Sequence, residues 1–280
     1  MVASPLPRNK QAKEHRNSLE NMTSALRVLG CSGGIGSQLR TTSFLLDDDI
    51  LIDAGTGVGD LSLDELRKIN RVFLTHSHLD HICSIPFMAD AVGSSRTKPL
   101  QVFGIKPTID ALRNHILNNV IWPNFTEIPS KEQPFITLHE INIHQVIDLG
   151  NQGSIAALPV NHSIPANAYA ITTDTGALVF TGDTGPCDAL WEHINQLKNL
   201  RHLIIETSFN DHEEKLAKIS GHLSPQLLMQ ELAKLKQTEA QVWITHLKPD
   251  GDLSIMEEIS NNNRSDLIIN AIERDQVIEF

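Results

Sequence analysis

The most informative stretch of the sequence is THSHLDH at residues 75–81, which directly follows a short apolar run. Three imidazoles and one carboxylate lie within six consecutive positions of this stretch. Residues two apart in an extended segment point the same way, so His76 and His78 can bind one ion from one side. Asp80 and His81 fall where the strand must turn, and they can point to a second position. Imidazole and carboxylate ligands suit Zn²⁺, Mn²⁺ or Fe²⁺, so the stretch predicts a metal site.

Three later residues have the same relation to an apolar run. His162, Asp183 and His246 each follow a predicted strand by one or two residues, and strand ends present side chains to a shared cleft. Singly, a histidine in such a place more often caps a strand than binds a metal. Together with the first cluster, the three complete a hypothetical two-ion site. The hypothesis assigns His76, His78 and His162 to one ion, Asp80, His81 and His246 to the other, and Asp183 to both.

The order of predicted elements indicates an α/β fold. The first half of the chain is mainly strands with one predicted helix, and further helices enter in the second half. The predicted strands are Leu26–Leu29, Ser43–Leu46, Ile50–Ile52, Arg71–Thr75, Leu100–Phe103, Phe135–Leu138, Ile143–Ile147, Ile155–Val160, Ala168–Thr172, Ala177–Thr181, Leu203–Ile205, Val242–Thr245 and Gln276–Ile278, and the predicted helices are Lys106–Leu117, Ala189–Leu200, Ser224–Lys236 and one from Ser265. Two sheets facing each other, with helices outside, fit this order. No linker divides the chain, so residues 25–280 are expected to form a single domain.

The charge balance restricts the possible partners. The chain has 280 residues, with 23 Lys and Arg against 34 Asp and Glu, so its formal net charge is −11. DNA, folded RNA and anionic membranes are normally bound by basic surfaces. Long nucleic acid is therefore an unlikely partner, and an anionic substrate must be small. The apolar runs are strand-sized and far shorter than the ~20 residues that span a membrane.

The termini and cysteines favour a cytoplasmic protein by default. Residues 1–24 carry several charges without a following apolar core, so they lack the plan of a secretory signal and are expected to be a disordered extension. The three cysteines include no Cys-x-x-Cys pair. Such a small, odd number argues against a disulfide framework or a thiolate metal cluster.

The motif set resembles the metallo-β-lactamase superfamily. The resemblance spans residues 26–249 and rests on THSHLDH at 75–81, DAG at 53–55, TGD at 181–183 and TH at 245–246. It implies an αββα sandwich, in agreement with the order of elements above. For Asp53 it implies an indirect role, steadying the loop that holds the ligands. An ordinary turn explains the spacing at Asp53 equally well.

A narrower motif set resembles the bacterial form of the class II cyclic-nucleotide phosphodiesterases. The set comprises LGCSGG at 29–34, HLDHI at 78–82, NHSIP at 161–165, IETSF at 205–209, GHLSP at 221–225 and ITHLKP at 244–249. The resemblance implies a hydrolase that converts 3′,5′-cyclic AMP, or also cyclic GMP, to the 5′-nucleotide through a hydroxide activated by two divalent metal ions. Zn²⁺ is the first choice, with Mn²⁺ or Fe²⁺ as alternatives. The implied partner is a small cyclic nucleotide, and the superfamily suggests a homodimer.

Three residues are candidates for catalysis: Asp80, His222 and Glu206. His222 lies just before a predicted helix, and Glu206 ends the preceding predicted strand. Glu206 could orient His222, and an oriented imidazolium could protonate the departing 3′ oxygen. This role is implied by the resemblance, since related tRNA 3′-processing endonucleases use a histidine in a similar motif. The alternative is a helix-capping histidine paired with a buried carboxylate.

A tRNA 3′-processing endonuclease is the main rival. Such enzymes bind tRNA through a basic arm between the third metal histidine and the bridging aspartate, but residues 163–182 contain no Lys or Arg. A β-lactamase would need an export signal. A thioester hydrolase of the glyoxalase II type lacks a segment like GHLSP at 221–225. A non-enzymatic relative should lack a ligand, and none is lacking.

Overall fold

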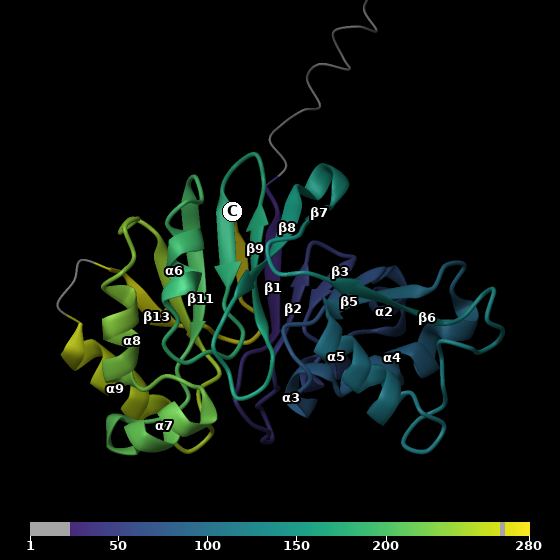
Figure 1. Ribbon diagram of the computed structural model, residues 1–280, viewed down its shortest axis with the longest axis horizontal. Coiled ribbons are helices and arrows are strands. Elements are labelled where there is room, and N and C mark those ends of the chain that lie inside the picture. Colours follow the sequence, from purple (N-terminus) through teal and green to yellow (C-terminus); the bar gives the residue numbers. More distant parts are fainter. Residues whose placement is uncertain (1–22, 264–266) are drawn as a thin grey trace, which may run out of the picture.

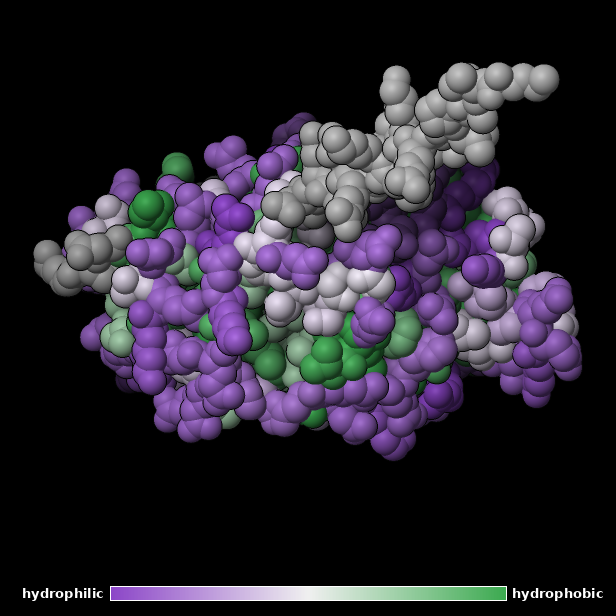
Figure 2. All heavy atoms as spheres, turned by 90° about the horizontal axis from the view of Figure 1, so that it is seen from above, coloured by the Kyte–Doolittle hydropathy of each residue, from purple (hydrophilic) through white to green (hydrophobic). Residues whose placement is uncertain are grey.

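The computed structural model describes residues 23–263 and 267–280. Two seven-stranded mixed sheets lie against each other, and helices cover the outer side of each (Figure 1). The four layers have the αββα order expected from the sequence. The face shown in Figure 2 is mainly hydrophilic, with hydrophobic areas between the polar side chains.

The first sheet has the strand order β14-β1-β2-β3-β4-β5-β6. Strands β14 to β3 pair antiparallel, and strands β3 to β6 pair parallel. The strands are β1 (Ala25–Gly30), β2 (Ser43–Leu46), β3 (Ile50–Ile52), β4 (Arg71–Phe73), β5 (Leu100–Ile105), β6 (Ile136–Ile141) and β14 (Val277–Glu279). The helical segments of this half are η1 (Thr56–Asp60), α2 (Leu63–Lys68), α3 (Leu79–Ile82), α4 (Ser84–Val92), η2 (Gly93–Ser95), α5 (Lys106–Ala111) and the π-helix η3 (Leu112–Ile116).

The second sheet repeats this plan with the order β13-β12-β11-β10-β9-β8-β7. Strands β7 to β10 pair antiparallel, and strands β10 to β13 pair parallel. The strands are β7 (Val146–Asp148), β8 (Ser154–Pro159), β9 (Asn167–Thr172), β10 (Ala177–Phe180), β11 (Leu200–Glu206), β12 (Gln241–Thr245) and β13 (Ile269–Ala271). The helical segments are η4 (Gly150–Gln152), α6 (Asp188–Ile194), η5 (Asp211–Glu213), α7 (Glu214–Ser220), α8 (Pro225–Leu232) and α9 (Asp252–Asn262).

Aromatic side chains pack the two sheets together. The rings of Phe44 and Phe180 meet edge to face with centroids 4.9 Å apart, and those of Phe73 and Tyr169 lie 5.7 Å apart. Every residue of β3 is buried, as expected for a strand covered on both faces. Separate apolar clusters join each sheet to its own helices. The sandwich is therefore a rigid support for side chains at its strand ends.

Most strand predictions are confirmed, and the helices between β3 and β5 are the main omission. Helix α2 begins with a capping box in which the Ser62 and Glu65 side chains each bind the other's main-chain N–H. The predicted helix from Ser265 starts outside the described residues, and its described part is wrong, because Ile269–Ala271 form a strand. The last helix is α9, and the apolar residues after it form β13, where Ile269 pairs with Val242 of β12. Parallel pairing to a buried strand outweighs helix propensity there.

Residues 1–24 are the predicted disordered extension. Of these, residues 1–22 lie outside the described residues. The last residue of the predicted extension, Ser24, is buried, and the Ser24 carbonyl accepts a hydrogen bond of 3.1 Å from the Phe280 N–H. Ser24 therefore belongs with the edge of the first sheet. Among the described residues, no helix combines the length and the hydrophobicity needed to cross a bilayer.

Candidate metal centre and active site

All seven predicted metal ligands come together, although they follow four different strands. His76, His78, Asp80 and His81 follow β4, His162 follows β8, Asp183 follows β10, and His246 follows β12. Their ligand atoms form two neighbouring groups, and within each group these atoms lie no more than 4.8 Å apart. The first group is His76, His78, His162 and Asp183, and the second is Asp80, His81 and His246. The convergence predicted from strand ends is thus present in the structure.

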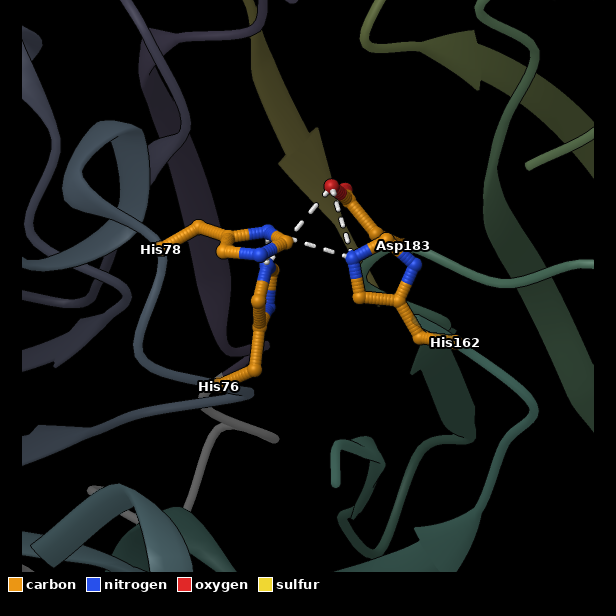
Figure 3. Close-up of side chains that lie close together, drawn as sticks. All are labelled: His76, His78, His162 and Asp183. Carbon is orange, nitrogen blue, oxygen red and sulfur yellow. Dashed lines mark hydrogen bonds and ion pairs between the residues drawn. The ribbon is translucent and has the colours of Figure 1, made fainter. Parts of the chain in front are cut away.

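The first group presents three ring nitrogens to one point. His76 Nε2 lies 3.0 Å from His78 Nδ1, and His162 Nε2 lies 3.2 Å from the same His78 nitrogen. Figure 3 shows these rings and the Asp183 carboxylate pointing toward one another from different segments of the chain. Burial lowers the pKa of His76 well below its ordinary value, and the neighbouring His81 lowers it further. A neutral imidazole with a free lone pair is the form that binds a metal.

The second group lies at the start of α3. Helix α3 begins at Leu79, so Asp80 and His81 lie within this short helix, whereas His78 before it has an extended backbone. His246 Nε2 is 3.2 Å from Asp80 Oδ2, and His81 Nε2 is 3.7 Å from that oxygen. This change from extended chain to helix is what divides one short stretch of sequence between two groups.

Asp183 lies between the two groups. Its Oδ2 is 3.7 Å from His76 Nε2 and 3.3 Å from His246 Nε2, while its Oδ1 is 3.4 Å from His81 Nε2. Burial raises the pKa of Asp183, but His246 and His81 outweigh this and hold the pKa well below its ordinary value. An ionised carboxylate in this place can contact a cation in either group.

One buried carboxylate, that of Asp53, holds the outer ring nitrogen of His81 directly and that of His76 through Thr75. His81 Nδ1 donates to Asp53 Oδ2 at 2.7 Å. The Thr75 hydroxyl donates to the same oxygen at 2.8 Å, and it accepts from His76 Nδ1 at 3.0 Å. Asp53 itself has a left-handed backbone with φ of 56°, a strained conformation that persists where the surroundings require it. The predicted indirect role of Asp53 is the one this geometry supports, in preference to a simple turn.

The outer nitrogens of His162 and His246 bind elsewhere. His162 Nδ1 donates to the Gly221 carbonyl at 2.9 Å, and His246 Nδ1 lies 2.9 Å from the Ser208 hydroxyl. Gly221 has φ of 71°, and a Cβ there would lie 2.9 Å from the His162 Cα. His246 also has a left-handed backbone, with φ of 62°. Fixed outer nitrogens aim the inner ones at the shared centre.

The donors fit a pair of divalent cations. His81 Nε2 is buried and has no hydrogen-bond partner among the described residues, although an unpaired buried polar atom is costly. The two ligand groups together contain five imidazoles and two carboxylates. A donor set of imidazole and carboxylate suits Zn²⁺, Mn²⁺ or Fe²⁺. Cations at this position would satisfy His81 Nε2 and separate the closely spaced ring nitrogens.

The two remaining predicted site residues form a buried pair beside the ligands. His222 Nδ1 donates to Glu206 Oε1 at 2.6 Å, and the His222 ring lies 4.9 Å from that of His162 and 5.5 Å from that of His246. Burial lowers the pKa of His222, but Glu206 outweighs this and raises it. The position of His222 also lets it form a third possible ligand group with Asp183 and His246.

A family model confirms the superfamily. The beta-lactamase superfamily domain matches residues 48–247, which contain every ligand described above. The chain belongs to the beta-lactamase superfamily. Its fold is that of the solved metallo-beta-lactamase fold protein YhfI from Bacillus subtilis, with a TM-score of 0.73, 19% identity, and coverage of 92% of this chain and 99% of that one. The αββα fold class is therefore also confirmed.

Two similar proteins bear the names of a cyclic-nucleotide phosphodiesterase and a tRNA-processing type of nuclease, the two activities that the sequence motifs resemble. A protein of Yersinia pestis named "Probable 3′,5′-cyclic-nucleotide phosphodiesterase" is 30% identical over 207 residues, which are 65% of this chain and 58% of that protein. A ribonuclease Z of Clostridium novyi is 31% identical over 156 residues, which are 51% of this chain and 49% of the enzyme. The chain thus spans little more than half the length of the first relative and about half of the second.

The residues predicted as ligands lie together in the structure, but apart from Asp53 their hydrogen-bond partners were not predicted. Ser208, Thr75 and the Gly221 carbonyl were not predicted to take part. A signal existed for Ser208, which lies two residues after Glu206 at the end of β11 and can face the same way in extended chain. The Gly221 carbonyl carries no side-chain signal. The roles of all these residues in binding and catalysis stay predictions.

Proposed function

We propose that this protein is a metal-dependent phosphodiesterase that hydrolyses 3′,5′-cyclic AMP, with cyclic GMP as a second substrate, to the 5′-nucleotide. The observation that carries the proposal is the convergence of two ligand groups on Asp183, with the His222–Glu206 pair directly beside them. The similarity to a relative named for this activity supports it.

The chain supplies the ligands for two ions. His76, His78 and His162 would hold one, Asp80, His81 and His246 the other, and Asp183 both. Two divalent ions, with Zn²⁺ as first choice, supply Lewis acidity and a nucleophile at neutral pH when bound. The protein's own contribution is to orient the ligands through Asp53, Thr75, Gly221 and Ser208 and to keep most of them away from bulk water.

His222 is proposed to act on the leaving group. Its Nδ1 donates to Glu206 Oε1, so the ring is held in place and Nε2 is the nitrogen left for the substrate. A proton on that Nε2 would pass to the departing 3′ oxygen as its bond to phosphorus breaks. Glu206 is fully buried and receives further hydrogen bonds from the Thr184 N–H at 3.1 Å and from Ser208. Glu206 therefore orients His222 without contacting the substrate.

A small substrate fits better than tRNA. The net charge of −11 is unsuited to an extended polyanion. Residues 163–182 form β9, β10 and their short connections, and the interval has no Lys or Arg. A single cyclic phosphate needs no such basic surface, because two divalent ions would provide the local positive charge.

A substrate panel tests the proposal. Purified protein is assayed with cyclic AMP, cyclic GMP, 2′,3′-cyclic AMP and a tRNA precursor, before and after exhaustive chelation, with metal analysis of the same sample. We expect conversion of cyclic AMP to 5′-AMP, and its loss on chelation. Cleavage of the tRNA precursor alone would establish the endonuclease instead, which the similarity to ribonuclease Z keeps as the second candidate. Turnover that survives chelation would refute the metal mechanism. Homodimerisation and a cytoplasmic location stay predictions.

A further inference from the structure

Ser208 is a fully buried serine that contacts three site residues at once. Its Oγ lies 2.9 Å from His246 Nδ1, 3.0 Å from Glu206 Oε2 and 3.3 Å from His222 Nδ1. A hydroxyl has one proton to donate and two lone pairs to accept with. Only one of the neighbouring groups can therefore receive the Ser208 proton, and the others must donate to Ser208 or bind elsewhere.

The surroundings of His246 decide the direction of these hydrogen bonds. His246 Nε2 faces two carboxylates, at 3.2 Å from Asp80 Oδ2 and 3.3 Å from Asp183 Oδ2. A ring nitrogen that binds a cation there must present its lone pair, so the His246 proton lies on Nδ1. That Nδ1–H donates to Ser208 Oγ. The Ser208 hydroxyl is then oriented to donate to Glu206 Oε2.

The Glu206 carboxylate completes a continuous chain of hydrogen bonds. Its Oε2 accepts from Ser208, and its Oε1 accepts from His222 Nδ1 at 2.6 Å. His222 Nδ1 has one proton to donate. The Glu206 carboxylate at 2.6 Å is a stronger acceptor than the Ser208 hydroxyl at 3.3 Å, so His222 donates to Glu206. In this chain His246 donates a hydrogen bond to Ser208, and both Ser208 and His222 donate to Glu206. One buried carboxylate thus orients a candidate metal ligand and the candidate acid together.

We propose that Ser208 is a positioning residue that holds His246 with its lone pair on Nε2 and couples this ring to Glu206 and His222. The inference deepens the proposed function at the same site. A side chain at position 33 cannot replace Ser208, because even a Cβ on Gly33 would lie 2.7 Å from His246 Nδ1 and 2.5 Å from the His246 carbonyl oxygen. A side chain that both accepts and donates is required between His246 and Glu206, and alanine can do neither.

The test compares Ser208→Ala with Ser208→Thr, which keeps the hydroxyl. Nitrogen-15 NMR of the Zn²⁺-loaded protein reports which nitrogen of His246 carries the proton. We expect a single Nδ1–H form in the wild type and in Ser208→Thr, and a mixture of both forms in Ser208→Ala. Competition with a chelator then measures Zn²⁺ affinity. We expect one of two sites to weaken by about ten- to a hundredfold in Ser208→Ala, the usual loss when a ligand's outer partner is removed.

Ser224→Ala is the matched control. Ser224 is also fully buried, but its hydroxyl has no hydrogen-bond partner among the described residues. Removing it should leave the His246 spectrum and the Zn²⁺ affinities within about twofold of wild type. If Ser208→Ala behaves like this control, the proposal is overturned. If Ser208→Ala does not fold, a His246 mixture in Ser208→Thr equally overturns it. Neither readout needs a substrate. A failure of the phosphodiesterase assay can therefore be told apart from a failure of this proposal.

Discussion

The two groups of candidate ligands are held by different means. In the first group, His76 is held by its neighbour Thr75 and His162 by a main-chain carbonyl, while His78 is only half buried. In the second group, His81 and His246 are buried and bind the side chains of Asp53 and Ser208. Both partners in the second group are side chains, whereas one of the two partners in the first group, the Gly221 carbonyl, is main chain and survives side-chain substitution. The second group should therefore be the more sensitive to mutation of residues that contact no metal.

Removing the shared ligand should have the largest effect. Asp183→Ala withdraws a carboxylate from both groups, so we expect both ions to be lost. Cyclic AMP turnover should fall by more than the 10–100-fold typical of residues that only orient a ligand. Elemental analysis and a turnover assay measure this, with Asp174→Ala, in the exposed turn between β9 and β10, as the control. Retention of two ions in Asp183→Ala would show that the groups are independent.

Removing His222 should separate catalysis from metal binding. We expect His222→Ala to keep its metal content and to lose about 10²–10⁴-fold in turnover, the usual contribution of a general acid. The loss should be smaller for substrates whose leaving group needs no proton. His202→Ala is the control, since His202 is another buried imidazole but is held by Trp243 and the Glu279 carbonyl instead of Glu206. Metal loss in His222→Ala would instead assign His222 to the ligands.

Asp53→Asn tests the difference between the groups directly. The amide offers one acceptor oxygen where the carboxylate offers two. An oxygen in the place of Oδ1 leaves His81 Nδ1 and the Thr75 hydroxyl without their acceptor, and an oxygen in the place of Oδ2 sets the amide NH₂ against the Thr75 main-chain N–H. We expect about a 10–100-fold weaker affinity for one ion, with a smaller change for the other, because His76 depends on Asp53 only through Thr75. A two-step competition with a chromophoric chelator measures both affinities. Equal weakening of both sites would show that the two groups do not differ in their sensitivity to such mutations.

Gly221→Ala should have the smallest effect on turnover and act mainly on stability. A Cβ at Gly221 would lie 2.7 Å from the Ser163 N–H nitrogen, and φ is 71°. We expect a loss of about 1–3 kcal/mol in the free energy of unfolding, measured by denaturant titration. Gly150→Ala shares the positive φ, at 72°, but has open space around it, so it isolates backbone strain from the clash. Equal losses in both variants would mean that the contact with the His162 loop contributes nothing.

The convergence of the candidate ligands could be predicted from the sequence better than the residues that support them. His162, Asp183 and His246 each follow a strand, and strand ends at one edge of a sandwich converge whatever lies between them. The partner of an outer nitrogen depends instead on packing between distant segments, as for His246 and Ser208, which are 38 residues apart. No periodicity in the sequence encodes such a contact.

The helices show the same limit. The short helices α2 to α4 carry too few turns for a clear apolar period. The helix expected from Ser265 failed because Ile269 pairs with Val242, a contact set by the neighbouring strand. Local pattern was sufficient where a strand is buried on both faces, as in β3, and insufficient where tertiary pairing selects the structure.

Metal loading measured against turnover tests the central claim most directly. Zn²⁺ is added in steps to the metal-free protein, and the formation of 5′-AMP from cyclic AMP is followed at each step. The account predicts negligible activity without metal, a rise with loading, and a plateau at two ions per chain. Full activity in the metal-free protein, or no 5′-AMP at any loading, would contradict it.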